Sequence, residues 1–379
     1  MNESTIHMAW SAGEALREFR TGVSLHSHTS HSKETLDFIP RFLAAVPGAG
    51  AMLRRYEARY RALHGQDINY FDAWWTPPLG PKEALELEQR QIESLNRQGL
   101  VSLSDHDNIE APLLLRVLSD SRETPISVEW TVPWRGTVLH IGVHNMGPRQ
   151  AVAKMEAMRR FTLEPQEAEL RRLFEWLTEE KETLIVFNHP YWDEKGRGQA
   201  HHEAMVEEFI AHCRRWIHAL ELNGLRPWAE NRRVMARAEE LALPAISGGD
   251  RHTCEPNALI NITRAETFGE FVEEIRSERL STVMVMPQYR EAMAGRILAG
   301  IGDVMRDNDD HTHGWTRWND RVFYRRAEDG ETAPLSAAFA AGREPFLIRA
   351  FLAGVRVMEH RQVRAAVRQI LQPAQELSL

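Results

Sequence analysis

Short β-favouring runs that end in polar side chains recur along the chain, and this recurrence most constrains its fold. The runs cover residues 22–28, 99–107, 125–132, 137–144, 182–190, 217–224 and 243–252, with 281–286 as a candidate eighth. Helical patterns lie between most of them, with apolar residues every three to four positions, at 80–98, 164–181, 203–218 and 228–242. Strands that alternate with helices of this length predict parallel β/α units, and seven or eight units favour an α/β barrel over an open sheet.

Two regions do not fit this alternation. Residues 37–98 are too long for a plain connection, since they hold a helical stretch at 39–67 and a Trp- and Pro-rich loop at 70–81. We therefore predict a helical insert that caps one end of a barrel of residues 20–286. The later sequence is dominated by helical patterns at 288–306, 335–342 and 345–372, which predicts a C-terminal helical extension over 287–379.

Potential metal ligands stand at the carboxyl ends of nearly all the predicted strands. His26 and His28 end the first run, and residues i and i+2 of an extended segment point to the same side. The strand ends together supply His26, His28, Asp105, His106, Glu129, His140, His189, Asp250 and His252. Functional groups of β/α barrels gather at this end, so we expect these side chains to converge.

A convergence of this kind is best explained by metal ions. A single histidine is most often an ordinary surface or core residue, but six imidazoles and three carboxylates in one place would be costly without a cation. Mixed nitrogen and oxygen donors suit Zn²⁺, Mn²⁺ or Fe²⁺ better than Mg²⁺ or Ca²⁺. Nine ligands exceed one coordination shell, which predicts two or three divalent transition metals.

Composition narrows the class of protein. The two cysteines, Cys213 and Cys254, exclude a disulfide framework and a thiolate zinc site. The formal net charge of −8 argues against a protein that mainly grips nucleic acid. No apolar run approaches the ~20 residues that span a bilayer, and the N-terminus does not resemble a secretion signal, so we expect a cytoplasmic protein with no membrane partner.

Six motifs resemble those of the PHP (polymerase and histidinol phosphatase) family. They are LHSHT, SLSDHD, SVEW, LHIGVH, FNHP and SGGDRH, in this order and over residues 20 to about 285. The resemblance implies a distorted (β/α)7 TIM-like barrel, a centre of two or three metals, and hydrolysis of phosphoesters. It implies one metal on His26, His28, Glu129 and Asp250, a second on bridging Glu129 with His140 and His189, and a third on His106 and His252.

The chain departs from the family pattern after the first histidine pair. Lys33 stands where many members have an acidic ligand of the third metal, so Glu34 or His31 is the substitute. Ser24 also replaces the Asp that usually precedes the pair.

The function we expect is hydrolysis of a small phosphorylated substrate by a metal-activated hydroxide. Asp105 would orient its neighbour or the leaving group. Arg251 is the first candidate for a phosphate contact, with a surface salt bridge as the alternative. Asn188 and Asn223 are candidate donors to substrate, with turn capping as the alternative. A hydrolase of another bond and a non-catalytic metal-binding accessory protein remain the other functions considered.

Two further patterns are less specific. Arginines of the segment 54–64, followed by Trp74 and Trp75, suit a nucleotide, but a solvated helix face with packing tryptophans is the better interpretation. The second His-x-His, His311 and His313, has no strand before it, so we expect it at the surface. The segment 315–318, with a Trp at each end, indicates a buried contact.

Overall fold

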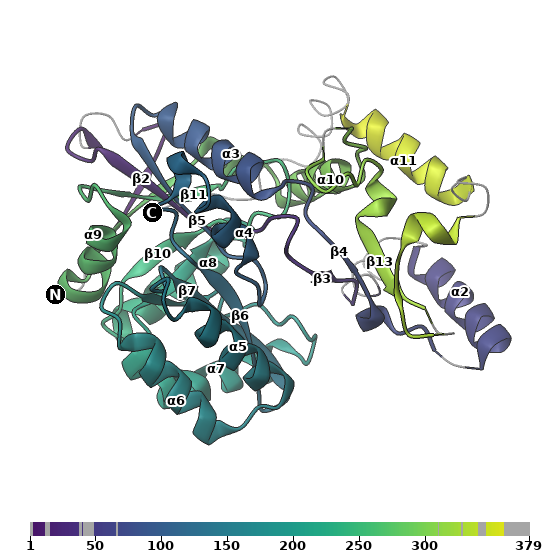
Figure 1. Ribbon diagram of the computed structural model, residues 1–379, viewed down its shortest axis with the longest axis horizontal. Coiled ribbons are helices and arrows are strands. Elements are labelled where there is room, and N and C mark those ends of the chain that lie inside the picture. Colours follow the sequence, from purple (N-terminus) through teal and green to yellow (C-terminus); the bar gives the residue numbers. More distant parts are fainter. Residues whose placement is uncertain are drawn as a thin grey trace.

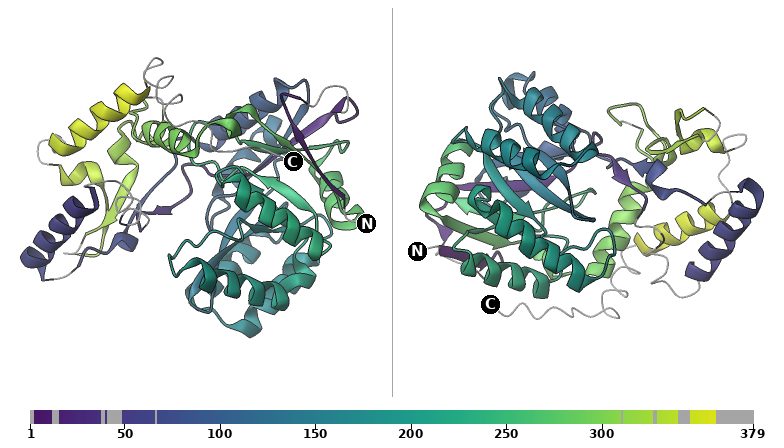
Figure 2. Two further views of the ribbon diagram at one scale, coloured as in Figure 1. Left: turned by 180° about the vertical axis from the view of Figure 1, so that it is seen from behind. Right: turned by 90° about the horizontal axis from the view of Figure 1, so that it is seen from below.

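The computed structural model describes residues 3–11, 16–37, 40, 49–65, 67–309, 311–326, 329–339 and 346–359. Within them the chain is a mixed α/β protein with three sheets, none of which closes into a barrel. Two parts lie side by side: a larger one, here called the main body, and a smaller one, the small lobe (Figure 1). Two further views show the small lobe on one side of the main body (Figure 2).

The first sheet of the main body has five strands. They are β1 (Glu3–Met8), β2 (Thr21–Ser27), β5 (Gln98–Leu103), β11 (Leu259–Thr263) and β12 (Leu280–Val285), in the order β1-β12-β11-β2-β5. Strands β2 and β5 run parallel, and β11 runs antiparallel to both of its neighbours. Gly22 of β2 allows a close approach, because a Cβ there would lie 2.6 Å from Ile92 Cγ2 of the covering helix α3 (Pro81–Glu93).

The second sheet holds most of the predicted strand ends. Its strands are β6 (Val128–Trp134), β7 (Thr137–His144), β8 (Leu184–Asn188), β9 (Ala219–Asn223) and β10 (Ala245–Gly248), in the order β10-β9-β8-β7-β6. Only β8, β9 and β10 are parallel neighbours. Strands β6 and β7 form a hairpin whose two turn residues, Arg135 and Gly136, have φ of 43° and 88°, as a type I′ turn requires.

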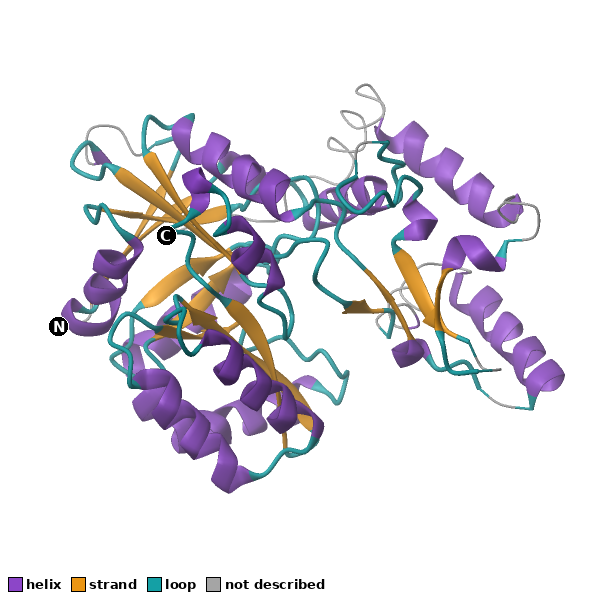
Figure 3. Ribbon diagram, in the orientation of Figure 1, coloured by secondary structure: helices purple, strands orange, loops and turns teal. Residues whose placement is uncertain are grey.

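Helices cover these sheets, as Figure 3 shows by colour. Besides α3, those of the main body are α4 (Glu110–Leu115), α5 (Ala151–Leu163), α6 (Glu167–Thr178), α7 (Gln199–Cys213), α8 (Trp228–Glu240) and α9 (Phe268–Glu273). The largest buried hydrophobic cluster lies between the second sheet and its helices, and it includes Trp130, Phe174 and Phe209. Shorter helical turns are Tyr70–Asp72, Ser119–Ser121, Arg214–Trp216, Glu274–Glu278, Pro287–Arg290, Trp318–Asp320 and Leu335–Ala338.

The two main-body sheets meet near the carboxyl ends of their strands. An isolated bridge joins Ser27, at the end of β2, to Arg251, which follows β10. A second bridge joins His106, which follows β5, to Glu129 of β6. The residues expected to bind metal therefore stand at the junction of the two sheets.

The small lobe combines two regions that are distant in the sequence. Its sheet contains β3 (Glu34–Thr35), β4 (Ala73–Trp75), β13 (Val322–Arg325) and β14 (Thr332–Pro334), in the order β14-β13-β4-β3. Its helices are α2 (Ala49–His64), α10 (Met293–Val304) and α11 (Phe346–Glu359). Helix α10 contacts the main body through Arg296, which pairs with Glu255 at 2.8 Å and donates to the Gly224 carbonyl at 2.7 Å.

The predicted strands and main-body helices are present, but their arrangement differs from the prediction. The two contacts β6–β7 and β7–β8 are antiparallel, so the chain is not a simple series of parallel β/α units. Strands β1 and β11 were not predicted, nor was helix α5. The segment after residue 287 is not purely helical, because β13 pairs with β4 of the predicted insert. The end of the predicted helix 345–372 lies outside the described residues. Within the described part of the chain, no helix is long and apolar enough to cross a membrane.

Candidate metal centre

Nine side chains converge at the junction of the two main-body sheets. They form three groups, and within each group the potential ligand atoms lie within 4.8 Å of one another. The groups are His26, Glu129, His189 and Asp250; His106, Glu129 and His140; and His28, Glu34, His106 and His252. Eight of the nine strand-end residues are in these groups, Asp105 is not, and the ninth member is Glu34, one of the two substitutes considered for the third metal. The partition differs from the one that the PHP resemblance implies at His28, His106 and His189.

Glu129 is the centre of the arrangement. Its side chain is fully buried, and its Oε2 lies 2.9 Å from His26 Nε2 and 3.3 Å from His28 Nε2. Its Oε1 lies 3.1 Å from His189 Nε2. Burial alone would raise the pKa of Glu129, but the surrounding imidazoles outweigh it and hold the pKa well below its usual value. A carboxylate that stays ionised and belongs to two groups is suited to bridge two cations.

The donor set fits divalent cations. Among the described residues, His26 Nε2, His28 Nε2 and Glu129 Oε2 are buried atoms without a hydrogen-bond partner, although they face one another. Burial lowers the pKa of His28, yet Asp250 and Glu129 outweigh it and raise the pKa to about 9. Buried lone pairs are costly unless a proton or a metal ion satisfies them. Nitrogen and carboxylate donors together match the preferences of transition metals.

The backbone of the site is strained at three candidate ligands. His26, His189 and Asp250 have φ of 61°, 24° and 54°, a left-handed region that non-glycine residues rarely adopt. Such residues cost roughly 1–3 kcal/mol each and cluster at functional sites. At His26 the strain coincides with a register shift of β2 between Ser24 and Ser27. The rings of His26 and His28, 5.1 Å apart, therefore lie where the strand pairing is irregular and not in the regular alternation expected from the sequence.

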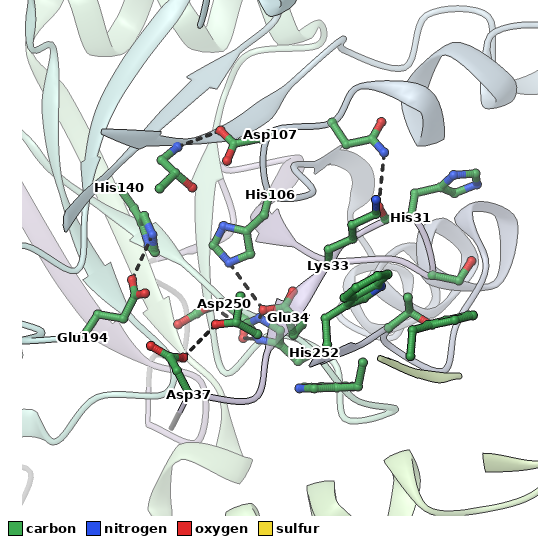
Figure 4. A pocket seen from close by; sticks show the side chains of 18 of the residues that line it. His31, Lys33, Glu34, Asp37, His106, Asp107, His140, Glu194, Asp250 and His252 are labelled. Carbon is green, nitrogen blue, oxygen red and sulfur yellow. Dashed lines mark hydrogen bonds and ion pairs between the residues drawn. The ribbon is translucent and has the colours of Figure 1, made fainter. Parts of the chain in front are cut away.

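Glu34 occupies the position that the sequence left open. It comes from β3 of the small lobe, and its Oε2 lies 3.2 Å from His252 Nε2 and 3.5 Å from His106 Nε2 (Figure 4). His31, the alternative, instead has its Nδ1 3.1 Å from the carboxylate of exposed Glu110. Burial would raise the pKa of Glu34, but His252 and His106 lower it strongly.

Two carboxylates that sequence analysis missed orient the imidazoles. Glu221 of β9 has Oε1 2.5 Å from His26 Nδ1, and its Oε2 accepts a hydrogen bond of 2.8 Å from the His189 amide. Glu194 has Oε2 3.1 Å from His140 Nε2, and the two side chains point toward each other in Figure 4. Carboxylates in this position fix the tautomer and direction of a ligating imidazole. Glu221 lies near the end of a predicted strand, so the strand-end rule could have found it; Glu194 follows a strand within an irregular loop and carried no such signal.

Arg251, the predicted phosphate contact, instead contacts other groups of the protein. Only 3% of the residue is exposed, and its Nε lies 2.9 Å from Oε1 of buried Glu88. Its terminal nitrogens donate to the carbonyls of His28 and Thr253 at 2.9 and 2.8 Å. Arg251 is not among the described residues that line the cavity, so its structural environment favours an internal ion pair over a phosphate contact.

Asp105, Asn188 and Asn223, the other predicted residues that are not metal ligands, also form hydrogen bonds to protein groups. Asn188 donates to Glu129 Oε1 at 2.9 Å, and Asn223 donates to Asp250 Oδ2 at 3.2 Å, so both position carboxylates. Asp105 accepts hydrogen bonds from the Thr29 amide at 2.5 Å and the Thr29 hydroxyl at 2.7 Å. It therefore holds the turn that follows His28, and it does not reach the cavity.

A cavity of about 1220 Å³ opens above the three groups. Among the described residues, its lining includes four cationic side chains, Lys33, Arg159, Lys195 and Arg226, and six carboxylates, Glu34, Asp37, Asp107, Glu110, Glu194 and Asp250. The aromatic side chains that line it are Trp74, Trp75, Trp192, Trp315 and Phe323, together with the imidazoles of His31 and His313. His313 is exposed, as expected, and it also lines the cavity. Its Nε2 lies 3.0 Å from the Ser30 hydroxyl, and its ring centroid lies 4.7 Å from that of Trp315.

The remaining predictions from sequence patterns agree with the structure in part. Arg54, Arg55, Arg59 and Arg61 of α2 are exposed and do not line the cavity, which agrees with a solvated helix face. Of the second His-x-His pair, His311 is only 5% exposed, so the prediction of a surface position was wrong for it, whereas His313 is exposed. Trp318 is buried, as the pattern of the segment 315–318 indicated.

Comparison with known proteins finds only distant similarity. No protein-family model matches the chain, and no curated protein matches it. Among solved structures, PsfC from Pseudomonas syringae PB-5123 is 14% identical with a TM-score of 0.39, over 71% of this chain and 93% of its own. An amidohydrolase from Chromobacterium violaceum is 17% identical with a TM-score of 0.32, over 47% and 84% of the two chains. A protein described as a metal-dependent phosphoesterase, from Bifidobacterium adolescentis, is 13% identical with a TM-score of 0.34, over 52% and 91%. Similarity at this level does not assign a function to the chain.

Proposed function

We propose that this chain is a metal-dependent phosphoesterase of the PHP type that acts on a small phosphorylated molecule. The observation that carries the proposal is the set of three ligand groups that share Glu129 and His106 beside a cavity whose lining includes Arg226 and other cationic side chains. Adjacent cations suit a substrate with several anionic oxygens, because they can contact the attacking and leaving sides of one phosphoryl group.

The metal ligands we propose are the members of the three groups. His26, His189 and Asp250 would hold one ion, His140 a second, and His28, Glu34 and His252 a third, with Glu129 and His106 each shared by two. When bound, Zn²⁺, Mn²⁺ or Fe²⁺ at these positions would lower the pKa of water and offset the negative charge on the phosphoryl oxygens. Glu221 and Glu194 would keep the imidazoles of His26 and His140 in the orientation that binding requires.

Arg226 is the residue we propose as the phosphate contact in place of Arg251. Its guanidinium stacks on Trp192 with 3.6 Å between the carbon Cζ and the ring centroid, and it lies 3.9 Å from Asp250 Oδ2. Arg226 lines the cavity, and its Nε is buried without a hydrogen-bond partner among the described residues. A guanidinium held in this way can present its planar donors to two phosphate oxygens.

We also propose that the main body is a distorted, incompletely closed seven-stranded barrel. The bridges Ser27–Arg251 and His106–Glu129 link the sheets on both sides, so β2, β5, β6, β7, β8, β9 and β10 follow one another around the site. The domain limits we propose are 20–286 for this unit, interrupted at 37–80 by the insert that joins residues 287–379.

Metal content and phosphoester turnover, measured on the same preparation, test the proposal. Two to three transition metals per chain are expected, with hydrolysis of p-nitrophenyl phosphate or its diester that stops on chelation and returns with metal. His28→Ala and Asp250→Ala should lose metal and turnover together. Full metal content without turnover of any phosphoester would favour a hydrolase of another bond or a non-catalytic protein, and a metal-free chain would contradict the whole site.

A further inference from the structure

A cluster of aromatic rings faces the cavity from the small lobe. Trp74 of β4 and Phe323 of β13 are paired in register, and their rings stack with centroids 5.8 Å apart and planes at 20°. The ring of Trp315 meets Phe323 edge to face at 5.2 Å. All three side chains line the cavity and are only partly buried, so ring surface remains open to a ligand. We call these three residues the aromatic wall.

The aromatic wall stands close to the candidate metal centre. Strand β3 pairs with β4 so that Glu34, a candidate ligand, is opposite Trp75, and Thr35 is opposite Trp74. The ring of Trp75 lies 6.1 Å from the ring of His252. Successive side chains of a strand point to opposite faces, so Trp75 shares a face with Glu34, whereas Trp74 shares a face with Thr35. The wall and the candidate ligands Glu34, His106, His140, His189, Asp250 and His252 line the same cavity, so one bound molecule can contact both.

Charged side chains also line the cavity near the aromatic wall and the candidate ligands. The Nζ of Lys33 lies 5.4 Å from the ring centroid of Trp74, in the position where the family resemblance expects an acidic residue. Lys195, which also lines the cavity, has its Nζ 3.3 Å from Oε1 of Glu194 and 3.6 Å from Oδ2 of Asp37. The cavity thus combines candidate ligand atoms, charged side chains of both signs, and aromatic rings. Its volume of about 1220 Å³ is far more than one phosphate needs and equals or exceeds that of typical small-molecule sites.

On the basis of the function proposed above, we propose that the aromatic wall binds a flat aromatic ring carried by the leaving group of the phosphoester. Partly buried aromatic rings favour a planar partner, because ring–ring contact adds to the gain from burying apolar area. A saturated ring of equal size gains only the area term. The wall therefore determines specificity and takes no part in bond cleavage.

Binding of two matched phosphonates, which cannot be hydrolysed, tests this proposal without requiring turnover. Benzylphosphonate and cyclohexylmethylphosphonate have the same charge and similar size, and they differ in the planarity and π-system of the ring. Isothermal titration of the metal-loaded protein should give about ten-fold tighter binding of the benzyl compound, as expected for one stacked ring. The preference should fall to about two-fold or less in Trp74→Leu and in Phe323→Leu.

Control variants separate the wall from the rest of the protein. Trp74→Phe keeps a ring and should keep most of the preference. Trp10→Leu removes a tryptophan that is 39% exposed and does not line the cavity, so the wild-type preference should persist. Thermal unfolding of each variant identifies a loss of fold, and the second wall variant then provides the comparison.

The outcomes distinguish this proposal from the proposed function. Equal binding of the two phosphonates, or a preference that survives both wall variants, overturns the aromatic wall as the specificity determinant. If neither phosphonate binds while phosphoesters are still hydrolysed, the proposal about the wall fails and the proposed function stands. A benzyl preference without any phosphoester turnover would support the wall and contradict the proposed function.

Discussion

The main body and the small lobe contribute to the candidate site in different ways. Eight of the nine candidate ligands come from the strand ends of the main body, and one, Glu34, comes from the small lobe. The main-body ligands are held by strained backbone and by buried partners such as Glu221 and Asn188. Glu34 depends on β3, a strand of two residues that pairs, within the described part of the chain, with β4 alone.

The two parts of the molecule therefore differ in how firmly they hold their ligands. The centre of the site is built from two packed sheets, where a displaced side chain would leave a buried charge without a partner. Glu34 and two residues of the aromatic wall, Trp74 and Phe323, belong to one small sheet, in which β13 comes more than 240 residues later in the chain than β4. We therefore expect changes in the main body to remove the whole centre, and changes in the small lobe to remove part of it.

The largest effect is expected from Glu129→Gln. Removing the charge that belongs to two ligand groups should empty most of the centre and lower phosphoester turnover by at least about 10³-fold. Elemental analysis and turnover on the same sample provide the measurement. Glu239→Gln, an exposed position on α8, is the matched control. Normal metal content in Glu129→Gln would remove this carboxylate from the centre.

A smaller, partial effect is expected from Glu34→Gln. Only the group of His28, His106 and His252 loses its carboxylate, so metal content should fall by about one ion per chain and turnover by about 10- to 100-fold. Glu110→Gln is a suitable control, because Glu110 is exposed and contacts His31 just outside the groups. If Glu34→Gln lost every metal, the proposed contrast between the main body and the small lobe would be wrong.

Glu221→Gln tests the support of the main-body ligands. The substitution keeps the size of the side chain but weakens its interaction with His26 Nδ1, so metal affinity should fall by about ten-fold while the full stoichiometry is reached at high metal concentration. A competition titration with a fluorescent chelator measures this shift. A stoichiometric loss that no metal concentration restores would instead make Glu221 a ligand.

The smallest effect concerns a buried imidazole of the main body outside the candidate centre. His218 precedes β9, and its Nδ1 accepts a hydrogen bond of 2.9 Å from the Ile185 amide. Burial, with a smaller contribution from Arg276, lowers its pKa to about 3. The unfolded chain, with a pKa near 6.5, takes up the proton first, so the stability contributed by neutral His218 is complete above about pH 6.5 and is lost as the pH falls toward 3.

His218→Asn should therefore weaken the acid dependence of stability. Between pH 7 and pH 5 the variant is expected to lose about 1–2 kcal/mol less unfolding free energy than the wild type, as measured by urea denaturation. His201→Asn, at an exposed position of α7, is the control. An unchanged pH slope in His218→Asn would show that this imidazole does not titrate on unfolding.

Local patterns in the sequence were informative where the chemistry is local. Strand-end positions identified His26, His28, His106, Glu129, His140, His189, Asp250 and His252. The reason is that a β-rich run followed by a polar ligand is a pattern of consecutive residues, which can be recognised without knowledge of the fold. Glu34 needed one more step, from the displaced acidic residue beside Lys33, and it remained one of two alternatives until its position beside His252 was known.

Roles that depend on which side chain faces which were not predictable. Arg251 and Arg226 are both arginines near strand ends, yet one is paired with buried Glu88 and the other lines the cavity. The same holds for Asp105, which binds Thr29, and for Glu221, which lies beside His26. The two residues of each pair carry the same functional group, and only the packing of distant segments gives them different contacts.

The sequence by itself determined the α/β class, most strands of the main body and the ligand types of the site, because periodicity and strand-end composition are short-range properties of the chain. The tertiary structure decided the antiparallel contacts of β7, the irregular strand pairing at His26 and the joining of β4 with β13. Pairing of strands so far apart in sequence is set by the burial of whole faces and by loop-closure entropy, neither of which leaves a local mark.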